Sequence, residues 1–329
     1  MAARISAPVW GRLAACGGWL TRPERRLATG AQLTKLPHRS WGIIWGTIWS
    51  LVLILAATAM AQQQVPVEPP HDSGQSVTAA YEGWFPNSDG TFSLLFGYFN
   101  RNIKQELDIP VGPENQIEPG GPDQGQPTHF LTRRQWGVFT VTVPKDFGSK
   151  KVVWKIVANG KATEVPAGLD TLWELSPFKD ATNNTPPFIA FAENGPFVQG
   201  PRGHSTTLTT TLPEPVTVNL WVADDANVSP GATRPKTAAV TLTLSKYRGP
   251  GTVTFANDKP TAEEAKFRAP APSVFTGKAT TTASFSEPGE YILRVVANDW
   301  SGEGGRGFQC CWSNAQIKVS VKPAAAGGR

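Results

Sequence analysis

The chain has 329 residues, among them 32 glycines and 29 prolines, and only 17% of its residues are charged. So many turn-forming residues beside so few Glu, Lys and Arg exclude a helical bundle or a coiled coil. The 40% hydrophobic content excludes a chain that is disordered along most of its length. We expect two domains at this length, because single hydrophobic cores rarely grow past about 250 residues.

The net charge of +5 is concentrated at the N-terminus. Residues 1–61 hold seven basic side chains and one acidic one, whereas the remaining 268 residues hold 24 basic and 25 acidic ones. The basic character therefore belongs to this leader. A near-neutral remainder lacks the positive surface that neutralises phosphates, so we expect no nucleic-acid partner.

The leader ends in an uncharged stretch of 21 residues, 41–61, which follows Arg39. A basic flank, an apolar run and the small residues Ala59 and Ala61 are typical of a secretory signal cleaved before Gln62. The alternative is a signal anchor that stays in the membrane, because about 20 apolar residues span a bilayer. Either outcome predicts export to the periplasm, the cell surface or the extracellular space, with membrane contact only through this segment if it is uncleaved.

Short β-branched runs separated by turns begin after the leader. Residues 62–76 contain proline and no apolar period, which predicts a flexible tether. Residues 137–144 alternate between two faces, and Asn159-Gly160 predicts a tight hairpin turn. A strand about every ten residues predicts a β-sandwich over residues 77–180.

The second half of the chain alternates even more regularly. The Pro- and Asn-rich residues 181–204 predict a linker. Nearly every segment within residues 205–322 has a period of two, which predicts a second sandwich, although residues 260–267 have the composition of one short helical turn. Residues 323–329 are predicted to be a disordered tail. The predicted fold class is all-β: two immunoglobulin-like β-sandwich domains in tandem after an N-terminal signal or transmembrane segment.

Three segments carry a resemblance to a known family. They are VADD at 222–225, LSKYRGPGTVTF at 244–255 and TASFSEPGEYILRVVAND at 282–299. Together they resemble a PKD-type domain, an immunoglobulin-like sandwich common in secreted and envelope proteins of bacteria. The resemblance covers residues 205–322 and departs from the family pattern in a longer insert after Asp299. It implies the sandwich fold, an exported location and adhesive, spacer or carbohydrate-associated roles, without implying any chemistry. The first domain resembles only uncharacterised secreted bacterial proteins.

Cys310 and Cys311 are the only cysteines after the leader, and they are adjacent. Neighbouring Cα atoms lie about 3.8 Å apart, less than the roughly 4.4–6.8 Å of a relaxed disulfide. Three outcomes stay open: two unreactive thiols, a strained ring disulfide between the two residues, or bridges to a partner chain.

The segment around these cysteines is the candidate binding loop. Its glycines predict mobility and its two tryptophans predict a surface suited to ligand contact. The alternative is that Phe308 and Trp312 cap the open end of the sandwich. The candidate binding residues are Trp300, Phe308, Cys310, Cys311 and Trp312.

Acidic and amide side chains gather at two predicted strand ends. Asp224, Asp225 and Asn227 follow one strand, and Asn298 and Asp299 follow another. Such oxygens suit calcium, and strand ends of a sandwich cluster in space. Asp and Asn are also ordinary turn residues. The candidate calcium ligands are therefore Asp224, Asp225, Asn227 and Asp299, and we expect no other cofactor.

No catalytic residue is predicted. His71, His129 and His204 are the histidines after the leader, and none lies near a nucleophile elbow, a metal-spaced histidine pair or a phosphate loop. Paired carboxylates for glycoside chemistry stay open, because a sandwich brings distant strands together.

The aromatic residues of the first domain allow two interpretations. Trp84, Phe85, Tyr98 and Phe99 have the ring faces that stack on sugars, but aromatics in strands also alternate between core and surface.

We expect a non-enzymatic exported envelope or extracellular protein. Its predicted role is adhesion, assembly, or binding of polysaccharide or an envelope protein through loops at the sandwich ends. One alternative is a secreted carbohydrate-active enzyme or its accessory binding module. Another is a redox or metal-handling protein that uses the vicinal cysteines.

Overall fold

The computed structural model describes residues 70–227, 238–300 and 310–324, which belong to one compact unit, Glu68–Arg329. The regular elements of this part are strands, apart from one short 3-10 turn, η1 (Thr171–Trp173). The predicted all-β class is thus confirmed. Within the described ranges, no helix has the length and apolarity needed to cross a membrane. The predicted leader lies outside these ranges.

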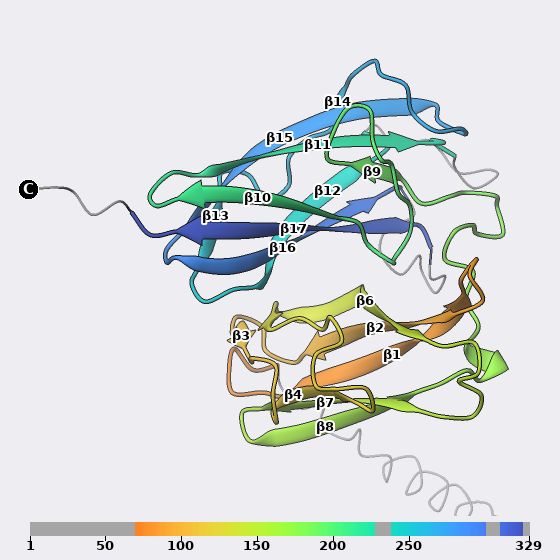
Figure 1. Cartoon of the computed structure of the whole chain (residues 1–329), viewed down its shortest axis with the longest axis vertical. Helices are drawn as coiled ribbons and strands as arrows, with labels where there is room; N and C mark the ends of the chain where they lie inside the picture. The colour runs from red at the N-terminus through yellow and green to blue at the C-terminus, as the bar shows by residue number, and fades with distance from the viewer. Residues whose placement is uncertain (1–69, 228–237, 301–309, 325–329) are drawn as a thin grey trace, which may run out of the picture. The chain divides into compact units, whose positions relative to one another are not determined.

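The first half folds into a sandwich of two three-stranded antiparallel sheets, with a two-stranded ribbon beside them (Figure 1). One sheet has the order β1-β2-β6, the other β4-β7-β8, and the ribbon is β3-β5. The bounds are β1 (Val77–Pro86), β2 (Phe92–Asn100), β3 (Leu107–Asp108), β4 (Asn115–Glu118), β5 (His129–Phe130), β6 (Arg133–Val143), β7 (Val152–Ala158) and β8 (Lys161–Ala167).

The local pattern of the sequence explains the β7–β8 hairpin. Residues of β7 alternate strictly between buried and half-buried positions, as a period of two requires. Asn159 and Gly160 connect the two strands with φ angles of 49° and 74°. Two consecutive positive φ angles match the turn that suits the strand twist, so the predicted hairpin is confirmed.

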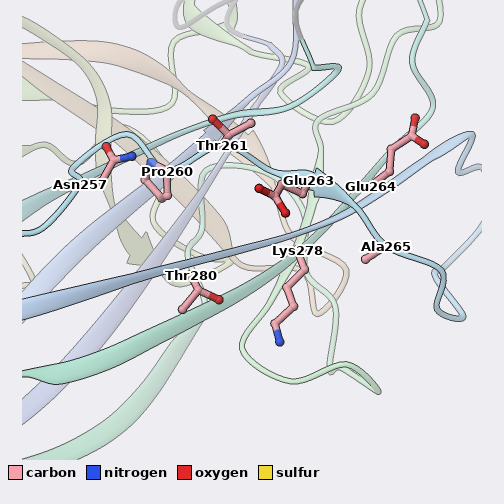
Figure 2. A pocket seen from close by; sticks show the side chains of 8 residues that line it. All are labelled: Asn257, Pro260, Thr261, Glu263, Glu264, Ala265, Lys278 and Thr280. Carbon is pink, nitrogen blue, oxygen red and sulfur yellow. The ribbon is translucent and has the colours of Figure 1, made fainter.

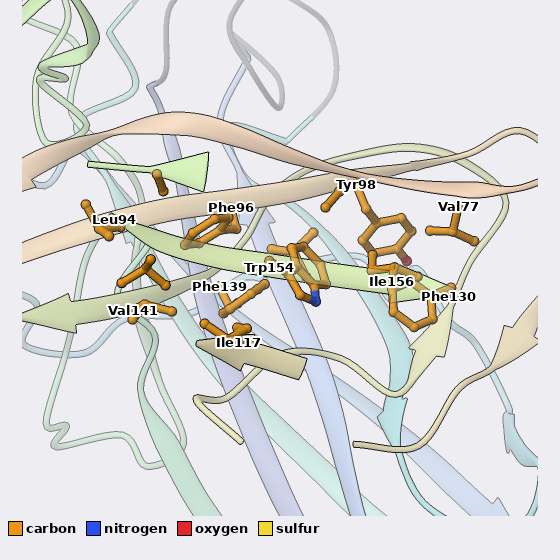
Figure 3. Close-up of a cluster of buried hydrophobic side chains, with 14 of the residues drawn as sticks. Val77, Leu94, Phe96, Tyr98, Ile117, Phe130, Phe139, Val141, Trp154 and Ile156 are labelled. Carbon is orange, nitrogen blue, oxygen red and sulfur yellow. The ribbon is translucent and has the colours of Figure 1, made fainter. Parts of the chain in front are cut away.

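Aromatic rings fill the space between the two sheets (Figure 3). Trp154 of β7 stands edge-on to Phe139 of β6, with 5.0 Å between ring centroids, and its Nε1 donates to Asn115 Oδ1 at 3.0 Å. Phe96 of β2 stacks on Phe139 at 5.4 Å. The tryptophan is fully buried with its one polar atom satisfied, which is the arrangement that stabilises a buried indole.

The second half is also a sandwich, with a four-stranded sheet packed on a five-stranded one (Figure 1). The orders are β10-β17-β16-β12 and β13-β15-β11-β9, with β14 paired to β15; β10 and β17 run parallel. The bounds are β9 (Phe188–Ala190), β10 (Ser205–Thr211), β11 (Val216–Asp224), β12 (Thr241–Arg248), β13 (Val253–Phe255), β14 (Glu263–Glu264), β15 (Phe275–Phe285), β16 (Gly289–Asn298) and β17 (Trp312–Lys322).

The structure corrects several segment predictions. Residues 181–204 are not simply a linker, because β9 lies within them and pairs with β11. Residues 260–267 hold the strand β14 rather than a helical turn. Residues 70–76 of the predicted tether pack on the following loop, where the backbone N–H of Gln75 donates to Asn102 Oδ1 at 2.7 Å. Only residues 323 and 324 of the predicted tail are described.

The outer faces of β16 and β17 contact the first sandwich instead of solvent. Leu95, Val296 and Trp312 form one buried apolar cluster there, and Trp312 is fully buried. The Trp312 ring lies directly on Gly137, a position where any Cβ would meet it. We call the contact region formed by these residues and Arg294 the junction.

Polar groups complete the junction. The Arg294 side chain is only 4% exposed, and its Nη2 donates to the backbone oxygens of Trp136 at 3.2 Å and Gly137 at 3.3 Å. Its Nη2 also donates to Asn314 Oδ1 at 2.9 Å. Buried Glu82 accepts from the N–H of Gly137 at 2.7 Å; burial raises the pKa of Glu82, whereas the nearby arginines act against that rise. The two sandwiches thus share a buried polar network.

Candidate functional site

One end of the second sandwich brings together most of the side chains that the sequence singled out. A compact loop, residues 180–185, lies against the ends of β11 and β16, and we call this region the rim. Asp180 Oδ1 accepts from the backbone N–H groups of Thr182 at 2.7 Å and Asn184 at 3.0 Å, which closes the loop. Thr185 donates to Asp225 Oδ2 through both its N–H, at 3.1 Å, and its hydroxyl, at 2.8 Å.

Asp224 is the most unusual side chain of the rim. It is 1% exposed, and its Oδ2 accepts from the N–H of Ala226 at 2.8 Å. Its Oδ1 has no hydrogen-bond partner among the described residues. Burial raises the pKa of Asp224 to about 8; the hydrogen bond from the Ala226 N–H acts against this rise, and the carboxylates of Asp225 and Asp299 contribute to it. Three acidic side chains therefore lie close enough to interact at this position.

Asn184 connects the loop to the end of β16. Its Nδ2 donates to Asp299 Oδ2, while its own Oδ1 is buried and has no partner among the described residues. The rim therefore holds two buried acceptor oxygens, one on Asp224 and one on Asn184, for which the described chain supplies no donor. Asn184 lies in the segment predicted to be a linker, and no local sequence signal marked it.

Cys310 and Cys311 form the ring disulfide, one of the three outcomes left open by the sequence. Both residues are buried. Sγ of Cys311 lies 3.5 Å from the backbone oxygen of Asn184, and the N–H of Asp299 donates to the Cys311 oxygen at 3.5 Å. The disulfide ring thus contacts the rim at Asn184 and Asp299.

This burial corrects the interpretation of the candidate binding loop as an exposed surface. Cys310, Cys311 and Trp312 present no side chain to solvent, and Trp312 packs in the junction instead of capping an open end. Trp300 is half-buried and donates from Nε1 to the Ala238 oxygen at 3.0 Å. Phe308 lies outside the described residues.

Reduction of the denatured chain is expected to add two titratable thiols to those present before reduction, because the ring holds both Cys310 and Cys311. In the folded chain the same reduction is expected to be slow, since both residues are buried. Thiol titration with and without denaturant measures this. A variant with serine at both positions is the control, and an unchanged thiol count in the parent chain would contradict the ring.

The predicted calcium ligands do not all face one point. Asp225 uses Oδ2 for Thr185 and Oδ1 for the N–H of Asn227, at 2.9 Å, and Asn227 itself is exposed. In the described ranges, no three His, Cys, Asp or Glu side chains are arranged to hold a metal ion. Of the four predicted ligands, Asp224 and Asp299 are the buried ones.

A second surface lies on the outward face of β11 and β15. Cross-strand pairs place Trp221 opposite Lys278 and Asn219 opposite Thr280. Nζ of Lys278 lies 5.0 Å from the centroid of the Trp221 ring, and the hydroxyl of Thr280 donates to Asn219 Oδ1 at 2.9 Å. Glu263 of β14 stands opposite Lys278 on its other side. We call this row of side chains the platform.

An open concavity of about 480 Å³ borders the platform. Figure 2 shows Lys278 and Thr280 on β15, together with the side chains of β14 and of the residues that precede β14. The lining residues are Asn257, Pro260, Thr261, Glu263, Glu264, Ala265, Lys278 and Thr280. Residues that carry hydroxyl, amide, carboxylate and ammonium groups therefore line this hollow. One feature of the sequence could have indicated the platform. In an alternating strand, Trp221 is a large aromatic residue on the face that is otherwise polar.

The other sequence candidates lie apart from both surfaces. Trp84, Phe85 and Tyr98 are buried in the first sandwich, which supports the core interpretation of these rings and not the sugar-stacking one. Phe99 is half-buried and is flanked by the guanidinium groups of two arginines, Arg101 at 5.7 Å and Arg133 at 5.5 Å.

The histidines occupy three unrelated places. Both ring nitrogens of His129 contact carboxylates, Asp108 at 3.0 Å and Glu106 at 3.1 Å. His204 stacks on Phe191 with 5.4 Å between centroids, and burial lowers its pKa. His71 is exposed at the start of the described chain.

No family model matches the sequence, and neither does any curated protein. The resemblance to PKD-type domains therefore stays a prediction. Among solved structures, PapD-like domain 7 of human CEP192 is 18% identical and covers 46% of this chain and 94% of its own, with a TM-score of 0.24. A protein of unknown function from Porphyromonas gingivalis W83 is 7% identical, with 75% and 100% covered and a TM-score of 0.22. CfaE, the adhesive subunit of the CFA/I fimbria of enterotoxigenic Escherichia coli, is 7% identical, with 79% and 82% covered and a TM-score of 0.22.

Proposed function

We propose that this chain is an exported, non-enzymatic binding protein that holds polysaccharide on the platform. The observation that supports this is the row of Trp221, Lys278 and Glu263 beside a polar hollow of about 480 Å³. Export rests on the predicted leader. The proposal moves the binding surface from the loops at the sandwich ends, where the sequence suggested it, to the face of a sheet.

The chemistry of the platform fits a neutral sugar. The C–H face of a pyranose ring packs on an indole, and its hydroxyls both donate and accept hydrogen bonds. Glu263 accepts, the Lys278 ammonium donates, and Asn219 does both. Two carboxylates, Glu263 and Glu264, and the Lys278 ammonium line the hollow, so its small net charge is negative and disfavours an acidic glycan relative to an uncharged one.

Lys278 lies over the indole of Trp221, with Nζ 5.0 Å from the ring centroid. Its attraction to the ring is worth about 0.5–1 kcal/mol at an exposed site, so displacing this flexible side chain costs little. A bound sugar would then take the place of the ammonium over Trp221 and leave the lysine free to donate to a sugar hydroxyl. The platform therefore needs only a side-chain movement to accept its ligand.

Replacing Trp221 by alanine is expected to weaken retention of the full-length chain on a neutral polysaccharide about 10-fold, because a tryptophan at the centre of a binding surface contributes most of its energy. Depletion assays on a panel of insoluble and soluble glycans measure the affinity. Trp173→Ala is the matched control, since Trp173 is 49% exposed on η1, away from the platform. It is expected to change retention less than two-fold.

Three results would overturn the proposal. The first is equal loss of binding in the Trp221→Ala and Trp173→Ala variants, and the second is no retention by any glycan on the panel. The third is release of reducing ends from the retained glycan that disappears in a carboxylate variant, because this result would make the chain a carbohydrate-active enzyme.

A further inference from the structure

The rim contains two buried oxygens for which the described chain supplies no hydrogen-bond partner. Buried oxygens almost always have a hydrogen-bond partner, because leaving one unpaired forfeits its hydration. Oδ1 of Asp224 and Oδ1 of Asn184 are both buried without a partner in the described chain. Both belong to residues that are at least nine-tenths buried, at 1% and 4% exposure.

These two oxygens lie in one neighbourhood. Asn184 precedes Thr185, which donates to Asp225, the residue next to Asp224. Asn184 also donates from Nδ2 to Asp299 Oδ2. Three separate segments, the 180–185 loop and the ends of β11 and β16, thus bring acceptor oxygens together.

We infer that the rim binds a calcium ion through the side-chain oxygens of Asp224, Asp299 and Asn184. A cation supplies what the described chain does not, a positive partner for the amide oxygen of Asn184 and the carboxyl oxygen of Asp224. It also offsets the repulsion between the carboxylates that meet at this point.

The set of ligands differs from the one that the sequence suggested. Asp225 is left out because its two oxygens already accept three hydrogen bonds, from Thr185 and Asn227, whereas Asp224 keeps one oxygen without a hydrogen bond. Asn227 is excluded because it is exposed. Asn184, from the 180–185 loop, is added to the set of ligands. The site uses two carboxylates and one amide.

The donor chemistry selects the ion. Zinc prefers nitrogen and sulfur ligands, whereas the rim offers oxygen alone, since both cysteine sulfurs are joined in the disulfide. Magnesium demands near-ideal octahedral geometry, whereas calcium accepts six to eight oxygens in flexible arrangements and completes them with water. Three side chains make a weak site, so we expect a Kd of about 0.1–1 mM, as in extracellular calcium modules.

The test is calcium-dependent thermal stability of the purified full-length chain after chelation. Calcium at 10 mM is expected to raise Tm by about 5 °C, because an ion that binds only the folded state stabilises it by mass action. Magnesium at 10 mM is expected to give less than a third of that shift. Titration calorimetry with calcium chloride gives the affinity directly.

Two variants locate the site. Asp224→Asn keeps the shape of the side chain and removes its charge, and Asn184→Ala removes the amide oxygen; each is expected to abolish at least two thirds of the calcium shift. Asp146→Asn changes an exposed aspartate of the first sandwich and is the control that retains the full shift. Because Asn184→Ala also removes the hydrogen bond to Asp299, the Asp224→Asn variant provides an independent reading if the alanine variant unfolds.

A parent chain whose Tm and calorimetric signal do not respond to calcium would overturn the inference and would indicate that a water or a proton satisfies the two oxygens. A calcium shift that survives both rim variants would place the ion elsewhere and overturn it as well. Neither result bears on glycan retention by the platform, so the two proposals fail separately.

Discussion

Replacing Gly137 by alanine is expected to lower the free energy of unfolding by about 3 kcal/mol. A Cβ at this position would lie 2.0 Å from Cζ2 of the Trp312 ring, far inside van der Waals contact. The backbone also has a φ of +49°, which disfavours any side chain. Because Trp312 is fully buried in the junction, its ring cannot move aside without opening the contact between the sandwiches.

Gly148→Ala separates the two causes. Gly148 has a similar φ of +59°, but the nearest atom to its added Cβ is 3.9 Å away. That variant is expected to lose only about 1 kcal/mol, the cost of the left-handed backbone alone. Urea denaturation of both variants measures the difference. Equal losses would show that the indole does not pack on Gly137 in solution.

Replacing Arg294 by methionine is expected to cost about 3 kcal/mol of unfolding free energy, because removing one partner from a buried charged network leaves the others unpaired. The oxygens of Trp136 and Gly137 would each lose a donor, and Asn314 Oδ1 would lose two bonds, from Nη2 at 2.9 Å and Nε at 3.2 Å. Methionine fills a similar volume, so the loss reflects polar groups more than a cavity.

Arg268→Met is the matched control, since Arg268 is exposed and the same substitution there is expected to change stability by less than about 0.5 kcal/mol. Arg294→Lys keeps the charge but not the planar fork, so we expect an intermediate loss. Chemical denaturation again provides the measurement. A methionine variant as stable as the parent would show that solvent already hydrates these oxygens and that the junction is open.

Most of the strands could be predicted from the sequence, because their signal is local. Side chains of a strand point alternately to two faces, so a period of two appears wherever one face is buried and the other is wet. β7, the first seven residues of β11 and the second half of β17 follow this rule. The Asn159-Gly160 turn could also be predicted from the sequence, since few residue pairs tolerate two positive φ angles.

The junction obscures the same signal. The first four residues of β17, from Trp312 onward, are all buried, because the inner face meets the core and the outer face meets the first sandwich. β2 shows the same run of buried positions for the same reason. A period of two predicts that a strand has two different faces, but it does not indicate whether solvent or another part of the protein covers the outer face. The sequence therefore suggested that Trp312 was either a loop residue for ligands or a cap, whereas it is part of the junction.

The candidate sites divide in the same way. The acidic residues at the ends of β11 and β16 could be found from the sequence because strand ends of a sandwich cluster, and Asp224 and Asp299 do meet at the rim. Asn184 could not be found, because its contact with Asp299 spans 115 positions of sequence. The platform likewise needs β14, a two-residue strand too short to have a period.

By itself, the sequence determined the all-β class, the approximate positions of the longer strands and the hairpin turn, because each follows from the steric preferences of neighbouring residues. Only the tertiary structure decided which faces are covered, which loop completes the rim and which tryptophan lies on the outward face of a sheet. Those choices depend on contacts between segments far apart along the chain, whose free energy comes from burying surface that no single segment can bury alone.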